Sequence, residues 1–219
     1  GGVLRARPLH LGDAHNRGGL IAMSIDFFNL FVIFFASIVT QNMVLANFLG
    51  LCPFVAVSNE IPTALGMGAA VIFVMFMTMA LNWPINHLIL VPLHVEYLQF
   101  LVYIMVIATF VQIVEVFIDR YSPVLYVSLG VFLPLITVNC AILGVLLIAT
   151  LRDYSYIQGL VYAVGSGIGW TLAIVAMAGI RQKLRYSRIP KGLQGPGITM
   201  IIAGIMAMAF MGFSGMVNV

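Results

Sequence analysis

Long apolar segments alternate with short polar segments along most of the chain. A helix of about 20 apolar residues is long enough to cross a hydrocarbon core of about 30 Å. The pattern predicts six such helices, over residues 25–51, 63–83, 97–117, 124–149, 157–178 and 197–216. We therefore expect an all-α membrane protein with six transmembrane helices.

The composition supports the same class. Hydrophobic residues make up 62% of the 219 residues and charged residues only 8%, and the mean hydropathy is +1.10. A water-soluble domain of this size could not bury so much apolar surface. Residues 23–219 should form a single six-helix domain that leaves no room for a soluble catalytic domain.

The first 22 residues differ from the rest because they carry Arg5, Arg7 and Arg17 and little apolar sequence. They are too polar for the core of a signal peptide. We expect residues 1–22 to be an N-terminal extension that is non-native or disordered. A short basic arm on the membrane surface is the alternative.

Basic residues predict the orientation, because Lys and Arg concentrate in cytoplasmic loops. Seven follow Met23, and five of these lie between the last two predicted helices: Arg181, Lys183, Arg185, Arg188 and Lys191. That loop should be cytoplasmic, which puts Arg120 inside, Arg152 outside and both termini in the periplasm. No basic surface of the kind that binds nucleic acid is expected.

A weak internal repeat divides the chain. Thr-Gln-Asn at 40–42 is echoed by Thr-Val-Asn at 137–139, and Ala-Leu-Gly-Met-Gly at 64–68 by Ala-Val-Gly-Ser-Gly at 163–167. Each half then holds three helices, and an odd number forces the halves to insert in opposite orientations. We expect two inverted three-helix repeats, of about 23–120 and 121–219.

The first and fourth helices should be broken. Residues 25–57 contain 33 residues with one charge, and a straight helix of that length would run about 50 Å, beyond the hydrocarbon core. The residues expected to supply the breaks are Asn42, Asn47, Gly50 and Pro53 in the first helix and Pro134, Asn139 and Gly144 in the fourth. Broken helices in inverted halves often mark a site at the membrane midplane.

Cys52 and Cys140 are the only cysteines, and each lies beside one of these expected breaks. Two thiolates cannot complete a four-thiolate iron–sulfur site or a closed zinc site, so a metal would need ligands from another subunit. Inert buried thiols and a disulfide remain alternatives. His87 and His94 lack ligand spacing and are expected to be polar residues at the membrane interface.

Polar residues also share one side of the third predicted helix. Gln112, Glu115 and Asp119 are spaced at i, i+3 and i+7, and a carboxylate within a membrane helix is a candidate for ion transfer. Glu115 could instead pair with Arg120 at the membrane surface. The glycines at 165–169 lie inside an apolar helix and predict close helix packing rather than a nucleotide loop.

Several motifs resemble a known family of membrane proteins. They are FLPLITVNCAI at 132–142, GSGIGW at 165–170, LAIVA at 172–176, AGIR at 178–181, NFLGLC at 47–52 and FMGFSG at 210–215. The family includes the E subunits of the sodium-translocating NADH:quinone oxidoreductase and the A subunits of the Rnf electron-transport complex. The resemblance covers essentially all of 23–219.

This resemblance implies an electron-relay subunit within a six-subunit complex of the bacterial inner membrane. In this family two cysteines from the chain and two from its membrane paralogue, the D subunit, hold one intramembrane [2Fe–2S] cluster. Those positions fall here on Cys52 and Cys140. NADH and the flavins would be bound by other subunits, since no Gly-rich dinucleotide motif is present, and the complex as a whole would reduce ubiquinone.

Three alternatives remain. The stretch 165–181 is more similar to the sodium pump, whereas Cys52-Pro53-Phe54 is more similar to the Rnf proteins, so membership of an Rnf ferredoxin:NAD⁺ complex is the second interpretation. Inverted repeats with broken helices are also typical of secondary transporters. A structural subunit with inert thiols is the third.

Overall fold

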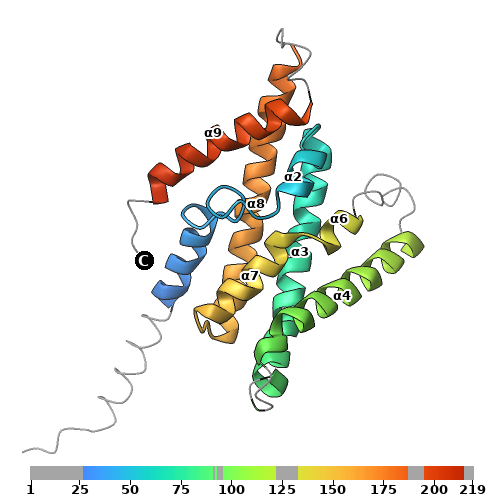
Figure 1. The fold of residues 1–219 in the computed structure, drawn as a ribbon, viewed down its shortest axis with the longest axis vertical. Helices are drawn as coiled ribbons and strands as arrows, with labels where there is room; N and C mark the ends of the chain where they lie inside the picture. Colours follow the sequence, from blue (N-terminus) through green and yellow to red (C-terminus); the bar gives the residue numbers. More distant parts are fainter. Residues whose placement is uncertain (1–26, 91, 93–95, 122–132, 187–194, 215–219) are drawn as a thin grey trace, which may run out of the picture.

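The computed structural model describes residues 27–90, 92, 96–121, 133–186 and 195–214. Every regular element in these ranges is a helix, which confirms the all-α class for the described part of the chain. Figure 1 shows α3 (Ile61–Ile85) and α8 (Tyr156–Leu184) running through the middle of the molecule, and they form the most extensive helix pair.

Four helical stretches are long and apolar enough to cross a membrane: Ile61–Leu90, Gln99–Val116, Pro134–Leu151 and Tyr156–Leu184. They match four of the six predicted helices. Two shorter apolar helices, Phe27–Ile38 and Pro196–Gly212, lie within the first and last predicted helices. The chain is therefore a multi-pass helical membrane protein by length and composition, and the inverted six-helix repeat stays a prediction.

Small residues explain why α3 and α8 pack so closely. A Cβ atom on Gly68 of α3 would collide with Thr171 of α8, and one on Gly167 would lie 3.0 Å from Cγ1 of Ile72. The opposite side of the same glycine-rich stretch contacts the helix Phe27–Ile38, where Gly169 faces the backbone of Ile38. This confirms the small-residue packing face predicted for 165–169.

The first predicted helix is broken, but earlier than expected. The helix ends at Ile38, residues 39–50 form turns, and the short helix α2 (Leu51–Val57) follows. The prediction of a helix through residue 51 is therefore wrong in its second half. Pro53 does not break a helix, because it lies in the first turn of α2, where a missing N–H removes no intrahelical bond.

The second break is much shorter. Only Val138 and Asn139 separate α6 (Leu133–Thr137) from α7 (Cys140–Leu151). Pro134 lies in the first turn of α6, and Gly144 is buried within α7, where the absence of a side chain makes room for Leu49 of the first break. Of the three residues expected to break this helix, Asn139 alone lies at the break.

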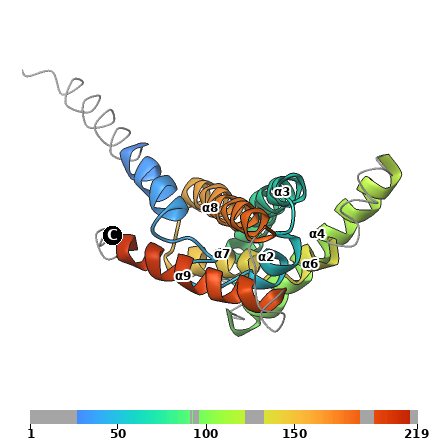
Figure 2. The ribbon, with the colours of Figure 1, turned by 90° about the horizontal axis from the view of Figure 1, so that it is seen from above.

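The remaining helices surround this centre unevenly. In Figure 2, α4 (Gln99–Tyr121) leans away from α3 and α8, while α9 (Pro196–Ser214) crosses the side that carries α2 and α7. Many apolar side chains of α4 are exposed, Met105 and Val116 at 71% among them, which is expected of a surface that faces lipid or another protein chain. The extension 1–22, His94 and the first part of the predicted helix 124–149 lie outside the described residues.

Candidate functional site

Cys140 occupies the first position of α7. At the end of α6, the N–H of Val138 donates a hydrogen bond to the carbonyl of Pro134, and the N–H of Asn139 donates one to the carbonyl of Ile136. Asn139 then caps α7, since its Oδ1 accepts a hydrogen bond of 3.0 Å from Ala141 N. The second break thus starts a new helix with a cysteine at its N-terminus, where Asn139 accepts hydrogen bonds from the N–H groups of Ala141 and Ile142.

The segment before Cys52 is held by an equivalent asparagine. Asn42 Oδ1 accepts from Val44 N at 3.1 Å, and its Nδ2 donates to the carbonyl of Gly169 in α8 at 2.7 Å. The segment ends at Gly50, which caps α2 with φ 81 and ψ 25. This left-handed conformation suits glycine, and it turns the chain directly into Leu51 and Cys52.

The two breaks meet at this glycine. Gly50 N donates a hydrogen bond of 3.0 Å to Cys140 Sγ across 90 residues of sequence. A Cβ atom at Gly50 would lie 2.8 Å from Trp170 Nε1, 2.9 Å from Ala141 Cβ and 3.0 Å from Asn139 Oδ1. The position therefore needs glycine for two reasons, its backbone conformation and the close approach of α7 and α8.

Both cysteines are free and exposed, which excludes the disulfide in this structure and the fully buried thiol. Beside them in the chain lie exposed apolar residues, Phe48 at 51% and Val138 at 73%, and Phe48 has the uncommon backbone angle φ 55. The thiols thus open onto apolar surface that a second hydrophobic chain could cover.

The two thiols can be compared with the ligands of a metal site. Among the described residues no group of three or more His, Cys, Asp and Glu side chains could hold a metal ion. Two exposed thiols on segments that contact each other fit half of a four-thiolate iron–sulfur site, provided that the other ligands come from a second chain. The Gly50 N–H bond to sulfur is of the kind that tunes such sites.

Two buried donors around Gly50 lack partners. Trp170 Nε1 and Asn139 Nδ2 are buried without a hydrogen bond, although their residues are 0% and 3% exposed. Trp170 ends the GSGIGW motif at 165–170, but nothing in the sequence predicts its contact with Gly50, since a tryptophan in an apolar helix is ordinarily a packing residue. Its position against Gly50 comes from the path of residues 39–50.

Arg181 is a second residue whose role differs from the one predicted. The basic residues near it predict only the orientation of a loop, yet its Nη1 donates to Val55 O at 2.9 Å and to Ser58 Oγ at 2.8 Å. These acceptors lie at the C-terminal end of α2, where carbonyl groups lack intrahelical partners. Arg181 therefore fixes the helix that carries Cys52 to the end of α8.

The predicted ion-transfer residues are separate from the cysteines. Gln112 is exposed and Glu115 half-buried on α4, and among the described side chains neither has a hydrogen-bond or ion-pair partner. The side chain of Asp119 lies outside the described residues. The ion-transfer role stays a prediction. His87 stacks on Trp83 with ring centroids 4.5 Å apart, and no metal-binding group of the described residues includes it.

Comparison with known proteins identifies relatives over nearly the whole chain. A family model described as "Rnf-Nqr subunit, membrane protein" matches residues 30–217. The chain is 50% identical over 189 residues to the A subunit of the ion-translocating oxidoreductase complex of Syntrophotalea carbinolica. The match covers 86% of the chain and 98% of that relative.

Two further relatives carry more specific names. The A subunit of the Na⁺-translocating ferredoxin:NAD⁺ oxidoreductase complex of Acetobacterium woodii is 49% identical over 187 residues, 85% of the chain and 97% of that relative. The E subunit of the Na⁺-translocating NADH-quinone reductase of Psychromonas ingrahamii is 50% identical over 193 residues, 84% of the chain and 96% of that relative. Sequence identity alone therefore does not distinguish the A subunits from the E subunits as relatives of this chain.

Proposed function

The chain belongs to the Rnf-Nqr family of membrane proteins, and from this premise we propose that it is an integral membrane electron-relay subunit of an ion-translocating oxidoreductase. It is not a complete enzyme by itself. Its part is to provide Cys52 and Cys140 as two of the four ligands of an intramembrane [2Fe–2S] cluster, with the other two from its membrane paralogue.

The observation that carries this proposal is the meeting of the two cysteine segments. Gly50 N lies 3.0 Å from Cys140 Sγ, and Cys52 follows Gly50 by two residues at the start of α2. Cysteines that serve only as packing residues are usually buried, whereas both of these are exposed. Exposure is what a ligand needs if its metal is shared with a neighbouring chain.

The residues of this chain would hold and insulate the cluster, which supplies one-electron transfer when bound. Gly50 contributes an N–H to the sulfur of Cys140, and Asn139 holds the start of α7 in place. Phe48 and Val138 give the site an apolar rim, and a covering chain would exclude water from it. Hydrogen bonds to sulfur and exclusion of water are among the principal means by which a protein sets the potential of such a cluster.

A sodium-pumping NADH:quinone oxidoreductase is the complex that we propose, in a bacterial inner membrane with both termini in the periplasm. NADH, flavins and quinone would bind to other subunits. The second candidate is an Rnf ferredoxin:NAD⁺ complex, because relatives with that name are as similar as the quinone-reductase relatives. The neighbouring genes distinguish the two: an NADH- and FAD-binding flavoprotein favours the first, a protein with several ferredoxin-like clusters the second.

The test is electron paramagnetic resonance of the reduced complex, purified with the paralogue. Cys52→Ala and Cys140→Ala should each abolish the [2Fe–2S] signal while the complex remains assembled, since each removes one ligand and little packing. Leu151→Ala is the matched control, because it shortens an exposed side chain at the opposite end of α7 without removing a ligand or changing the rim of the site. It should leave the signal intact.

An undiminished cluster signal in either cysteine variant would reject that cysteine as a ligand. Iron analysis tests the sharing of the cluster. About two iron atoms per heterodimer are expected when the paralogue is present, and none when this chain is purified alone. A full cluster in the isolated chain would reject the heterodimer while leaving the cysteine assignment in place.

A further inference from the structure

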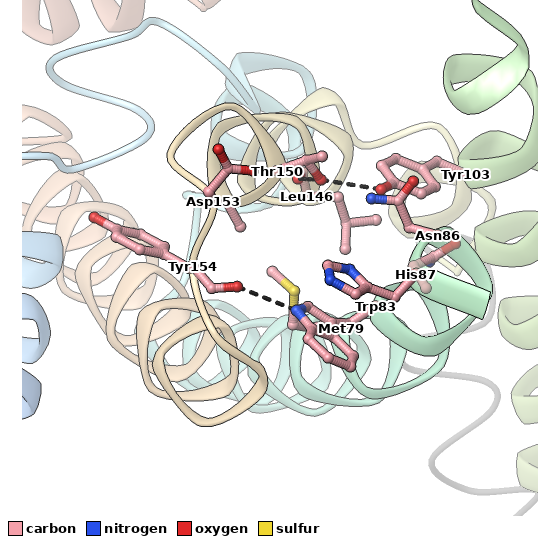
Figure 3. A pocket seen from close by; sticks show the side chains of 11 residues that line it. Met79, Trp83, Asn86, His87, Tyr103, Leu146, Thr150, Asp153 and Tyr154 are labelled. Carbon is pink, nitrogen blue, oxygen red and sulfur yellow. Dashed lines mark hydrogen bonds between the residues drawn. The ribbon is translucent and has the colours of Figure 1, made fainter. Parts of the chain in front are cut away.

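A cavity of about 310 Å³ lies beside the start of α8, whereas Arg181 lies in the last turn of that helix. It forms where α3 ends, α4 begins and the chain turns from α7 into α8, and Trp83 Nε1 donates to Tyr154 O across it. Figure 3 shows Thr150 and Tyr103 along one side of the cavity and Trp83 with the stacked ring of His87 on another. Nothing in the proposed electron relay uses this cavity.

Asn82, one of the residues that line the cavity, has a buried oxygen atom without a partner. Asn82 is 1% exposed, and its Nδ2 donates to Thr78 O at 2.9 Å, but its Oδ1 accepts no hydrogen bond. An unsatisfied buried amide oxygen costs about 1–3 kcal/mol, so such atoms usually have a water, an ion or a ligand beside them. The group that satisfies Asn82 must be a donor or a cation.

The hydroxyl groups in the wall present oxygen to the cavity as well. Thr150 Oγ1 donates its hydrogen to Leu146 O, so Tyr103 must be the donor in the 3.0 Å bond between the two hydroxyls. Gln99 Nε2 in turn donates to the Tyr103 oxygen at 2.9 Å. Both hydroxyl hydrogens are therefore used, and only oxygen lone pairs remain available to a ligand.

Asp153 adds the single carboxylate among the residues that line the cavity. It is exposed at the turn between α7 and α8, where its backbone has φ 48. Oxygen acceptors with one negative charge are the ligands that hard cations prefer. A quinone headgroup would fit poorly, because it has no donor group and would leave the Asn82 oxygen unsatisfied.

The end of α3 is itself irregular at this place. Pro84 lies inside the helix, and the turn that follows, Asn86–Leu90, is a π-helix. A proline removes one backbone bond, and π-helical turns often accompany binding sites because they reorient side chains. Here the turn brings Asn86 and His87 to the cavity wall, where their side-chain N–H groups can bind water.

We propose that this cavity binds a partly hydrated Na⁺ ion through Asn82 Oδ1, Asp153 and the hydroxyl oxygens of Thr150 and Tyr103. The volume equals about ten water molecules, so the ion would keep part of its hydration shell. The choice of Na⁺ rests on the proposed function, since two relatives are named as Na⁺-translocating. The cavity would be the place where the transported ion enters or leaves this chain.

Equilibrium dialysis of the purified complex against ²²Na⁺ tests the site without any need for turnover. Asp153→Asn should raise the dissociation constant of one class of Na⁺ sites about fivefold, because it removes one exposed charge. Asn82→Leu should raise it about tenfold, because it replaces the buried oxygen by a side chain of similar size. Other subunits can also bind Na⁺, so the readout is the difference between wild-type and variant complexes.

Glu60→Gln is the matched control, since it neutralises another exposed acid at the far end of α3 and should change nothing. Unchanged Na⁺ binding in Asp153→Asn, which is expected to fold, would overturn the proposal. Binding of ethanolamine in place of Na⁺ would also overturn it, in favour of a lipid headgroup. The [2Fe–2S] signal should persist in both cavity variants, so failure of this site and failure of the electron relay are distinguishable.

Discussion

The first helix break, residues 39–50, is twelve residues long, whereas the second, residues 138–139, is only two residues long. Both contain an asparagine whose Oδ1 accepts the N–H of the residue two positions later, Val44 in one and Ala141 in the other. The shared part is thus the asparagine, as the sequence repeat predicts. The difference is the length of chain between asparagine and cysteine.

That difference has a structural consequence. Cys140 follows Asn139 directly, whereas Cys52 lies ten residues after Asn42, so the repeat does not align the cysteines. The additional residues carry the chain from α8, where Asn42 is anchored, to α7, where Gly50 meets Cys140. The long break therefore brings the two cysteine segments together, while the short break holds its cysteine at a helix N-terminus.

The largest effect should follow from Gly50→Ala. A residue with a side chain costs about 1–2 kcal/mol in this left-handed conformation, and the overlap with Trp170, Ala141 and Asn139 should add about 1–3 kcal/mol. Unfolding by SDS in mixed micelles measures the loss of stability, and the [2Fe–2S] signal should weaken in the same variant. Gly195→Ala is the control, because Gly195 has φ +99 but no atom within 4 Å of the added Cβ.

Gly195→Ala should cost about 1 kcal/mol, from the backbone conformation alone. Equal losses for Gly50 and Gly195 would mean that the close approach of the two breaks contributes nothing to stability.

The two asparagines should differ in the same experiment. Asn42→Ala removes two hydrogen bonds, one of them to Gly169 in α8, and should cost about 2–3 kcal/mol. Asn139→Ala removes only the cap on α7 and should cost about 1 kcal/mol. Equal costs would show that the anchoring of the long break to α8 is unimportant.

Particular residues show what can be predicted from the sequence. Hydropathy locates the four long helices, and the repeat locates Asn42 and Asn139, because both signals are local. The prediction that Pro53 and Pro134 break helices is wrong, since a proline in a first turn starts a helix as readily as it ends one.

The roles of Trp170, Arg181 and the cavity at Asn82 cannot be found in this way. They depend on contacts between residues that are far apart in sequence, 126 positions for Arg181 and Val55. Apolar helices also lack the alternation of polar and apolar faces that would indicate which side packs inward, because lipid and protein are both apolar surroundings. The cysteine site is accessible to sequence reasoning only because thiols are rare in this chain.

Arg181→Ala also affects the first break, but it should lower the unfolding free energy less than Asn42→Ala does. It removes two bonds from Nη1 to the end of α2, and a loss of about 1–2 kcal/mol is expected. The short α2 needs this attachment, whereas the 12-residue α7 is buried along one side and does not. SDS unfolding measures this loss of stability, and the width of the cluster signal measures the effect on the cluster.

Lys183→Ala is the control for Arg181, since Lys183 is an exposed basic residue on the same last turn of α8. The unfolding free energy of Lys183→Ala should stay within about 0.5 kcal/mol of the wild-type value. A similar loss for both variants would assign the effect to the charge of the loop rather than to the attachment of α2.

The smallest effect is expected at Asn47, the third asparagine predicted to support the breaks. Its side chain is exposed, and its Nδ2 reaches only Met43 Sδ at 3.7 Å, so it satisfies no backbone group as Asn42 and Asn139 do. Asn47→Ala should therefore change the unfolding free energy by less than about 0.5 kcal/mol. The reduction potential of the cluster, followed by redox titration, should not move either. A shifted potential with unchanged stability would mean that Asn47 donates a hydrogen bond to the cluster in the assembled complex, and that the long break contributes to the electronic environment of the cluster as well as to its position.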